Sequence, residues 1–284
     1  MSADVVVAPA VQAGAAPGRG SRGRARALAV ARRDVLTGLV ALAVGAVVWE
    51  LVSLLVPLDW LPRFSEVMAS TGDLLQDPAF RAALVESTVY VLEGYLLSAV
   101  IGIVVGAAMG LVPLVDRALR YYLDLALFVP PIVMAPVFLI VLGLSRTTLL
   151  AIIVVFASTV IAVNTRTAVA GTDEQLRDVA RSFGADRRTV LTRVVLPGAL
   201  PLVFVGLHLG IARAVKGMII GQLFLAVIGL GAYSARFERA FDAVGTWSVA
   251  VLVIALSLVL SWVVKVADVV VNDWAYRAAG ARDE

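Results

Sequence analysis

The sequence of 284 residues contains no cysteine and a single histidine, His208. Without cysteine the chain cannot form disulfides, thiol nucleophiles or thiolate metal sites, and one histidine argues against metal catalysis. The sequence also lacks a GxxxxGKS/T phosphate loop, an HExxH helix, a GxSxG elbow and a DxD-type carboxylate cluster. These absences argue against an enzyme, and they predict that this chain binds no cofactor of its own.

Charged residues are scarce, at 16% of the chain, whereas hydrophobic residues make up 61%. Apolar runs of about twenty residues recur, and an α-helix of that length can cross a bilayer. The composition therefore predicts an all-α polytopic membrane protein with six transmembrane helices. The expected spans are residues 35–56, 88–111, 123–144, 147–163, 200–228 and 244–264.

Basic residues outside the spans are unevenly distributed. Residues 1–34 are rich in Ala, Gly, Pro and Arg, which is typical of a disordered basic tail. A cleaved signal peptide is the alternative, although the run 35–56 has the length of a span. The predicted external loops hold only Arg63, Arg81, Arg146, Arg236 and Arg239. The positive-inside rule therefore gives both termini and segment 172–197 to the cytoplasm. No basic patch with interleaved aromatics occurs, so the expected environment is a lipid membrane and no nucleic-acid partner is expected.

Segment 172–197 is the one long charged interruption in the second half of the chain. Its first part places Leu176, Val179, Ala180 and Phe183 on one helical face, with Gly184 as the stop signal. A second short helix is expected to begin after Asp186 and to end at Pro197, because proline disfavours helical geometry in the residue before it. The segment therefore predicts a helix, a glycine corner and a second helix.

The second span contains small residues that allow close helix packing, whereas the third contains prolines that interrupt a helix. In the second, small residues recur at every fourth position, at Gly94, Ser98, Gly102, Gly106 and Gly110. This pattern predicts a seam against which another helix packs closely. Residues 113–120 are expected to form a short basic turn. The third span then contains Pro130, Pro131 and Pro136, which should kink or break the helix.

Charged side chains within the spans are few. Arg213 and Lys216 lie three residues apart near the middle of span 200–228. A charge at membrane depth is costly and usually faces a cavity, so the pair suits a path for an anion. The alternative is that one or both pair with Glu93 or with backbone carbonyls. For His208, a packed or lumen-facing helix residue and a proton-linked role both stay open.

Segment 172–197 resembles a cytoplasmic signature of permease subunits of ATP-binding-cassette importers. That signature reads Glu-Ala-Ala, three residues, Gly, nine residues, Ile, any residue, Leu-Pro. The sequence has Asp178-Val179-Ala180, Gly184, Val194 and Leu196-Pro197 with every spacing kept. The stretches Leu61-Pro62, Ser65-Glu66-Val67, Asn164-Thr165 with Gly171, and Gly229-Leu230-Gly231-Ala232-Tyr233 are similar to the nitrate, sulfonate and taurine branch of this family.

The resemblance implies a type I ABC importer permease (MetI-like) fold over a transmembrane domain of residues 35–284, with coupling helices in 172–197. The implied ATPase-coupling residues are Asp178, Ala180, Phe183, Gly184, Leu196 and Pro197. The candidates for the translocation path are Arg213, Lys216, His208 and Gln222, the last standing where that branch often has a carboxylate. Asp178 would pair with a basic residue of the ATPase or, alternatively, with Arg181 on a solvated face.

The resemblance also implies partners. They are a cytoplasmic ABC ATPase dimer that holds ATP and Mg²⁺, a second permease copy (homodimer or paralogue) and an extracytoplasmic substrate-binding protein. The expected location is the inner membrane. Three alternatives stay open: an ABC permease for another solute such as a vitamin precursor, an ion-coupled secondary transporter, and a non-transport membrane scaffold. A secondary transporter would be expected to show repeats and buried carboxylates, and only Glu50 and Glu93 are candidates.

Overall fold

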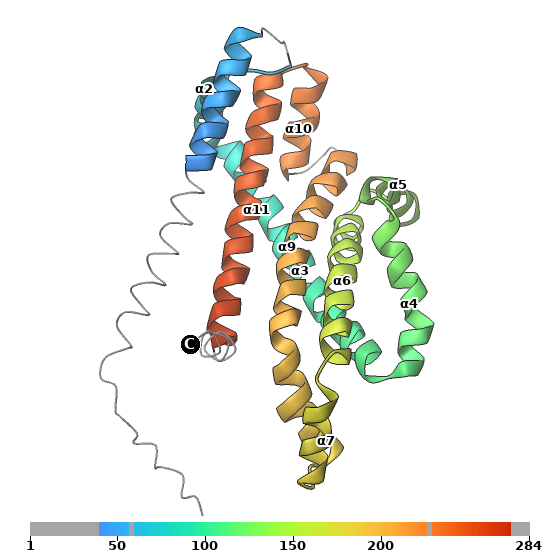
Figure 1. Ribbon diagram of the computed structural model, residues 1–284. Helices are drawn as coiled ribbons and strands as arrows, with labels where there is room; N and C mark the ends of the chain where they lie inside the picture. The colour runs from blue at the N-terminus through green and yellow to red at the C-terminus, as the bar shows by residue number, and fades with distance from the viewer. Residues whose placement is uncertain (1–39, 57–59, 226–228, 274–284) are drawn as a thin grey trace, which may run out of the picture. The chain divides into compact units, whose positions relative to one another are not determined.

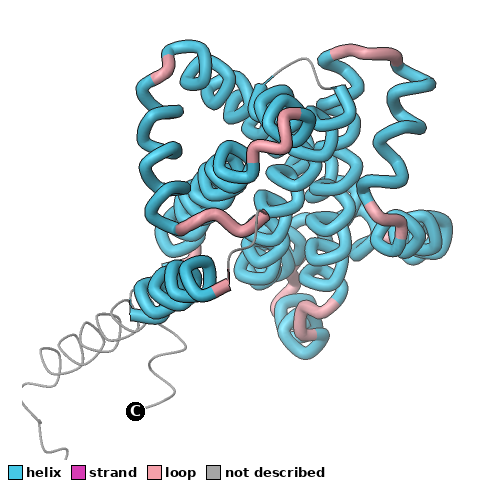
Figure 2. Tube along the Cα trace, turned by 90° about the horizontal axis from the view of Figure 1, so that it is seen from above, coloured by secondary structure: helices cyan, strands magenta, loops and turns pink. Residues whose placement is uncertain are grey.

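The computed structural model describes residues 40–56, 60–225 and 229–273. The predicted tail, residues 1–34, lies outside them. The described residues consist of helices and short loops (Figure 2). The chain divides into two units, Met1–Leu58 and Asp59–Glu284. In the first unit, the apolar helix Val40–Leu55 covers most of the predicted span 35–56.

The second unit contains all the other helices that the structure describes. They are α2 (Phe64–Gln76), α3 (Pro78–Leu111), α4 (Pro113–Phe128), α5 (Pro131–Leu142), α6 (Arg146–Ala170), α7 (Glu174–Ser182), α8 (Arg187–Val190), the π-helical η1 (Leu191–Val195), α9 (Leu196–Leu225), α10 (Gly229–Arg239) and α11 (Ala243–Val271). Figure 1 shows α7 at one end of this unit and α2 and α10 at the opposite end.

The described residues include four helices that are long and apolar enough to cross a membrane: Pro78–Leu111, Arg146–Ala170, Arg187–Leu225 and Ala243–Val271. A fifth span is added if α4 and α5, which meet at a bend of 111°, count as one broken span. These helices confirm an all-helical protein that crosses the membrane several times. The count of six spans stays a prediction.

Helix α6 is the centre of the packing, because α3 and α9 both approach it through glycines. A Cβ atom added at Gly94 or Gly106 of α3 would lie 2.4 Å from Ile153 Cγ2 or from the Ala162 carbonyl oxygen. On the other side, a Cβ atom at Gly210 or Gly221 of α9 would lie 2.7 or 2.6 Å from an α6 side chain. The predicted seam of small residues in α3 is confirmed, and α9 carries a second one.

The prolines of the third span break it, as the sequence predicts. Helix α4 ends at Phe128, and α5 begins after Pro130, with Pro136 inside it. The prediction of a short basic turn at 113–120 is wrong, since these residues form the first two turns of α4. Pro113 occupies the first helical position, where its missing N–H costs nothing, so it starts a helix there. Asp116 then forms ion pairs with Arg120 and with Arg166 of α6.

Pro197 does not end a helix, which corrects the second boundary predicted for segment 172–197. The helix that starts at Arg187 continues to Leu225. Just before the proline, η1 widens the helix, and the Leu196 N–H donates to the carbonyl oxygen of Leu191, five residues back. A wide turn of this kind relieves the crowding that proline causes in the preceding turn. The loop is therefore joined rigidly to a long membrane helix.

Candidate functional site

The corner between α7 and α8 has the geometry that the sequence predicts. Gly184 has φ +80°, a left-handed conformation that favours glycine. Its N–H donates to the Arg181 carbonyl oxygen over 2.9 Å, and the Ala185 N–H donates to the Ala180 carbonyl oxygen over 3.1 Å. These two bonds form a Schellman motif, which satisfies carbonyls at the end of α7. The predicted helix and glycine corner are confirmed.

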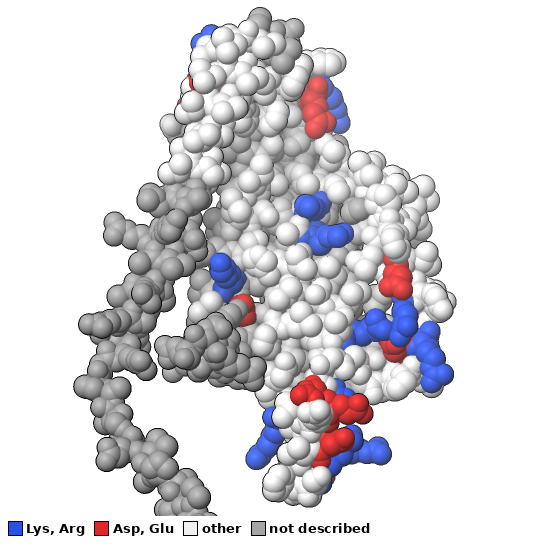
Figure 3. Space-filling view, viewed as in Figure 1, with Lys and Arg blue, Asp and Glu red and all other residues white. Residues whose placement is uncertain are grey.

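Helix α7 exposes an apolar stripe at the end of the molecule. Leu176, Val179 and Phe183 are exposed by 56%, 52% and 87%. The charged side chains around them include both signs, as Figure 3 shows around α7. Large apolar side chains that gather on an otherwise charged helix mark a surface for a partner.

Ala180 lies at the edge of the same helical face, next to Leu176. It is half-buried and packs against a core cluster that includes Val190, Val195 and Ala199 of the helix running into α9, with Ala168 and Val169 from the end of α6. Ala180 therefore contacts the core of this chain, whereas the larger side chains of the stripe stay exposed. The same cluster connects α7 mechanically with α6 and α9.

The remaining coupling candidates are Asp178, Leu196 and Pro197. Asp178 accepts a hydrogen bond of 3.1 Å from Arg181, and both side chains are largely exposed, so the pair contributes little to stability. Leu196 and Pro197 begin α9 directly after the π-helical turn. They lie in the helix that supports α7, not in the exposed stripe. A role of all six coupling residues in binding an ATPase stays a prediction.

Arg213 and Lys216 lie in the middle of α9. Lys216 is exposed and Arg213 is half-buried, and neither forms an ion pair with a described residue. Figure 3 shows basic side chains without an acidic neighbour on an otherwise uncharged face over α9. Glu93, the partner considered from the sequence, instead forms an ion pair with Arg146, which also lies over the ring of Tyr90. Arg213 and Lys216 can therefore interact with water or with an anion from outside the described residues.

The other two path candidates lie apart from this pair. His208 is exposed and lines a cavity of about 260 Å³ between α9 and α11, next to Lys265 and Asp268. Gln222, in contrast, is fully buried. The structure therefore does not bring the four candidates together in one site of a single chain.

Gln222 belongs to a polar network that sequence reasoning missed. Its Oε1 accepts hydrogen bonds from the Ser87 hydroxyl over 3.0 Å and from the Gly231 N–H over 3.1 Å. The Ser87 hydroxyl oxygen in turn accepts a bond of 2.9 Å from the Leu230 N–H. The network ties the start of α10 to α3 and α9. The sequence feature that could have indicated this network is the pair of glycines at 229 and 231, which allow the start of α10 to approach Gln222 closely.

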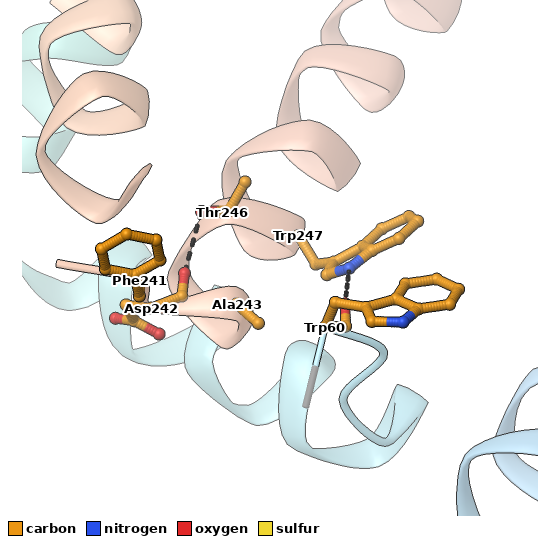
Figure 4. A pocket seen from close by; sticks show the side chains of 6 residues that line it. All are labelled: Trp60, Phe241, Asp242, Ala243, Thr246 and Trp247. Atoms are coloured by element: carbon orange, nitrogen blue, oxygen red, sulfur yellow. Dashed lines mark hydrogen bonds between the residues drawn. The ribbon is translucent and has the colours of Figure 1, made fainter. Parts of the chain in front are cut away.

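A second cavity, of about 330 Å³, lies between the loop before α2 and the start of α11 (Figure 4). Trp60 and Trp247 form one side, and the Trp247 Nε1–H donates to the Trp60 carbonyl oxygen over 3.0 Å. Phe241, in the turn before α11, is 96% exposed and has φ +53°. A bulky residue in this conformation is strained, so the turn presents its ring to the outside at a cost.

These elements define the class of protein: a multi-pass helical membrane protein with an apolar helical corner at one end. Residues 98–270 match the family described as "Binding-protein-dependent transport system inner membrane component". The match covers more than half of the chain, so the chain belongs to this family. It is therefore a membrane component of a transport system, as the sequence predicts.

Individual relatives agree with this assignment. The chain is 30% identical to the taurine transport system permease protein of Escherichia coli (strain K12), over 70% of this chain and 75% of that protein. It is 29% identical to the formylaminopyrimidine transport permease protein of Halalkalibacterium halodurans, over 71% of this chain and 81% of the relative. It is 24% identical to the nitrate import permease protein of Synechococcus elongatus, over 79% and 83%.

Among solved structures, the chain is similar to a subunit of the inward-facing MetNI methionine ABC transporter. The TM-score is 0.57 at 18% identity, and the match covers 69% of this chain and 99% of that subunit. At this identity the likeness establishes the fold alone. The predicted MetI-like fold is confirmed.

Proposed function

We propose that this chain is the membrane-spanning permease subunit of an ATP-driven importer and forms the path for a small anionic solute. Family membership and the MetI-like fold support the class. The single observation that supports coupling to an ATPase is the exposed apolar stripe of α7. The chain carries out no bond chemistry, and a separate ATPase dimer supplies the energy and holds ATP and Mg²⁺.

The stripe suits a groove on a cytoplasmic ATPase. Phe183 is the most exposed of the three side chains, and a large aromatic side chain in a partner pocket commonly contributes much of the binding energy of an interface. A push on α7 would reach α6 and α9 through the cluster that contains Ala180. Because the helix from Arg187 to Leu225 is continuous, the same push reaches Arg213 and Lys216. ATP binding and hydrolysis would thus switch the bundle between two arrangements.

The docking proposal is tested with two exposed phenylalanines. Phe183→Ala should weaken association with the partner ATPase by about 30-fold, as expected for loss of an aromatic anchor. Phe241→Ala is the matched control, since its ring is as exposed but lies in the turn that follows α10, which Figure 1 shows at the end opposite α7. Association is measured by pull-down of the ATPase with the detergent-purified chain. Equal retention of the ATPase by wild type and Phe183→Ala would contradict the proposal.

The anionic solute is inferred from α9. Two cations at the middle of a membrane helix, without a carboxylate partner among the described residues, are costly unless they face water or an anion. The face of α9 that holds Lys216 also exposes Val205 and Leu209. A second permease copy, identical or paralogous, would cover this face and enclose a path between the two. Relatives named for taurine and nitrate favour a sulfonate or a similar small anion.

The path proposal is tested by uptake into proteoliposomes that contain the permease and the ATPase, with the binding protein and ATP supplied. The double variant Arg213→Gln with Lys216→Gln should lower uptake of labelled taurine or nitrate by tenfold or more, roughly the scale of electrostatic focusing. ATPase binding should stay unchanged. The control Arg117→Gln removes an exposed cation from α4, away from the proposed path on α9. Unchanged uptake in the double variant would remove Arg213 and Lys216 from the path.

The same assay separates the alternatives. Uptake of a pyrimidine in place of an anion would favour a vitamin-precursor permease, which the Halalkalibacterium halodurans relative suggests. Uptake driven by an ion gradient without an ATPase would identify a secondary transporter. If the chain shows neither uptake nor binding to the ATPase, the result would favour a non-transport membrane scaffold.

A further inference from the structure

A cavity of about 560 Å³ lies beside the α7–α8 corner, on the side of α7 that faces the bundle. Its lining combines basic and apolar side chains, including Arg177, Arg181, Arg187, Asp186, Leu111 and Val190. Leu111 is the last residue of α3, and Val190 precedes η1. The cavity therefore lies where two long apolar helices end and the charged loop begins.

The three arginines differ in how they are held. Arg177 donates from Nη2 to the Val169 carbonyl oxygen over 2.6 Å, at the end of α6, and its buried Nε has no acceptor among the described residues. Arg187 makes no side-chain hydrogen bond or ion pair with a described residue. Arg181 pairs only with the exposed carboxylate of Asp178. The lining thus has arginine N–H groups without acceptors among the described residues.

Asp186 is the one carboxylate in the lining, and it already has a partner. Its Oδ1 accepts a hydrogen bond of 3.1 Å from the Thr189 N–H and so caps α8. Hydrogen bonds from Thr189 lower the pKa of the Asp186 carboxyl below its ordinary value, so the group stays charged at neutral pH. Three arginines still outweigh this single charge, and the cavity favours an anion.

We propose that this cavity binds a phosphate group. Guanidinium groups match phosphate oxygens in pairs of parallel hydrogen bonds. The apolar part of the lining, with Leu111 and Val190, suits the glycerol and acyl stem of an anionic phospholipid, and basic pockets at the ends of membrane helices bind such head groups. Free phosphate offers the same chemistry without the stem.

A bound phosphate would bridge the two sides of the glycine corner. Arg177 belongs to α7, and Arg187 begins α8, on the other side of Gly184. A ligand held by both would fix the angle between α7 and the helix that continues into α9. The site would thus restrict the orientation of α7 and of its exposed stripe relative to α9. This role is additional to the ATPase docking proposed above.

The experiment uses the purified full chain in detergent and native mass spectrometry, with no ATPase or transport needed. Dioleoyl phosphatidylglycerol should bind more tightly than dioleoyl phosphatidylcholine. Arg177→Gln and Arg187→Gln should each weaken phosphatidylglycerol binding by about fivefold, the effect of one basic residue near a membrane surface. Arg188→Gln is the matched control, because Arg188 neighbours Arg187 but does not line the cavity. It should change binding by less than twofold.

A parallel titration with inorganic phosphate, followed by thermal unfolding, distinguishes the source of the phosphate. Stabilisation by phosphate that Arg187→Gln abolishes, without lipid preference, supports the site and assigns it to a soluble ligand. The proposal is overturned if the chain shows no preference for phosphatidylglycerol and phosphate does not stabilise it. It is also overturned if Arg188→Gln weakens phosphatidylglycerol binding as much as Arg187→Gln does. Arg177→Gln loses the hydrogen bond to Val169 and can unfold for that reason. In that case Arg187→Gln by itself tests phosphate binding, since Arg187 makes no such bond.

Discussion

Gln222 illustrates how a polar residue in a membrane helix can serve packing. Its Oε1 holds the Ser87 hydroxyl and the Gly231 N–H in a site closed to solvent. A Cβ atom at Gly229, which has φ +62°, would lie 2.3 Å from Gln222 Nε2. The glycines at the start of α10 are therefore required by the closeness of this side chain.

Replacing Gln222 by leucine should leave the Gly231 N–H without its acceptor. The Ser87 hydroxyl loses its acceptor as well, whereas the Gln222 Nε2 group, which is buried without a partner among the described residues, is removed. The net change is one more buried unsatisfied donor, which costs roughly 1–3 kcal/mol, so the free energy of unfolding of Gln222→Leu should fall by that amount. Thr159→Val is the control, because the buried Thr159 hydroxyl only donates to the Val155 carbonyl oxygen of its own helix. The two are compared by unfolding the purified chain in sodium dodecyl sulfate. Equal stability of both variants would contradict a structural role for the network.

Glycine seams decide the arrangement of the central helices. Helices α3 and α9 both approach α6 at positions where a Cβ atom would collide with α6. Without a hydrophobic driving force between helices in lipid, such close approach supplies much of the packing energy. The seams therefore set how closely α3 and α9 pack against α6.

The seam predicts a contrast between two glycines. Gly106→Ala should destabilise the chain by roughly 1–3 kcal/mol, because the new Cβ would lie 2.4 Å from the backbone oxygen of Ala162. Gly72→Ala in α2 has no atom within 4 Å of its new Cβ and should stabilise by roughly 0.5–1 kcal/mol. Both are measured by thermal unfolding of the purified chain. A loss of similar size in both variants would show that close packing at α6 is not the cause.

The glycine corner gives a second prediction at this scale. Gly184→Ala meets no atom within 4 Å, but φ +80° costs an alanine roughly 1 kcal/mol, which should loosen the end of α7. Hydrogen exchange at residues 180–186 should therefore rise, and stimulation of the partner ATPase should fall. Gly198→Ala, in α9 beside the same loop, should leave both unchanged because its nearest neighbour lies 3.7 Å away. Unchanged exchange in Gly184→Ala would mean that the Schellman bonds do not hold the corner.

The second unit, Asp59–Glu284, has two distinct ends, and the absence of cysteine from the sequence makes its orientation in the membrane measurable. Phe183, directly after α7, and Phe241, in the turn between α10 and α11, are both almost fully exposed. Figure 1 shows α7 and α10 at opposite ends of this unit. The distribution of Lys and Arg predicts that the Phe183 end faces the cytoplasm. A single introduced cysteine at either position would be the only thiol in the chain.

A membrane-impermeant maleimide applied from outside should therefore label Phe241→Cys in sealed spheroplasts. Phe183→Cys should be labelled only after the membrane is opened with detergent. The expected difference in labelling before permeabilisation is tenfold or more, on the order of the exclusion of a charged reagent by a bilayer. Labelling of Phe183→Cys alone in sealed cells would reverse the predicted orientation.

Several features could be predicted from the sequence because they depend on neighbouring residues. The long spans follow from apolar length, the break at 129–130 follows from prolines, and the α7 corner follows from Gly184. The seam of α3 follows from small residues at every fourth position. Each signal is local, so no knowledge of the rest of the fold was required.

The sequence by itself thus determined an all-helical membrane protein of this transport family, with an apolar helix at a glycine corner. Only the tertiary structure decided that the helix continues through Pro197, because the π-helical turn at Leu191–Val195 relieves a clash that local rules treat as a stop. It also decided that Ala180 packs inside the chain and that Gln222 bonds to Ser87, 135 residues away. Contacts between distant segments depend on how helices pack, and no spacing along the chain records them.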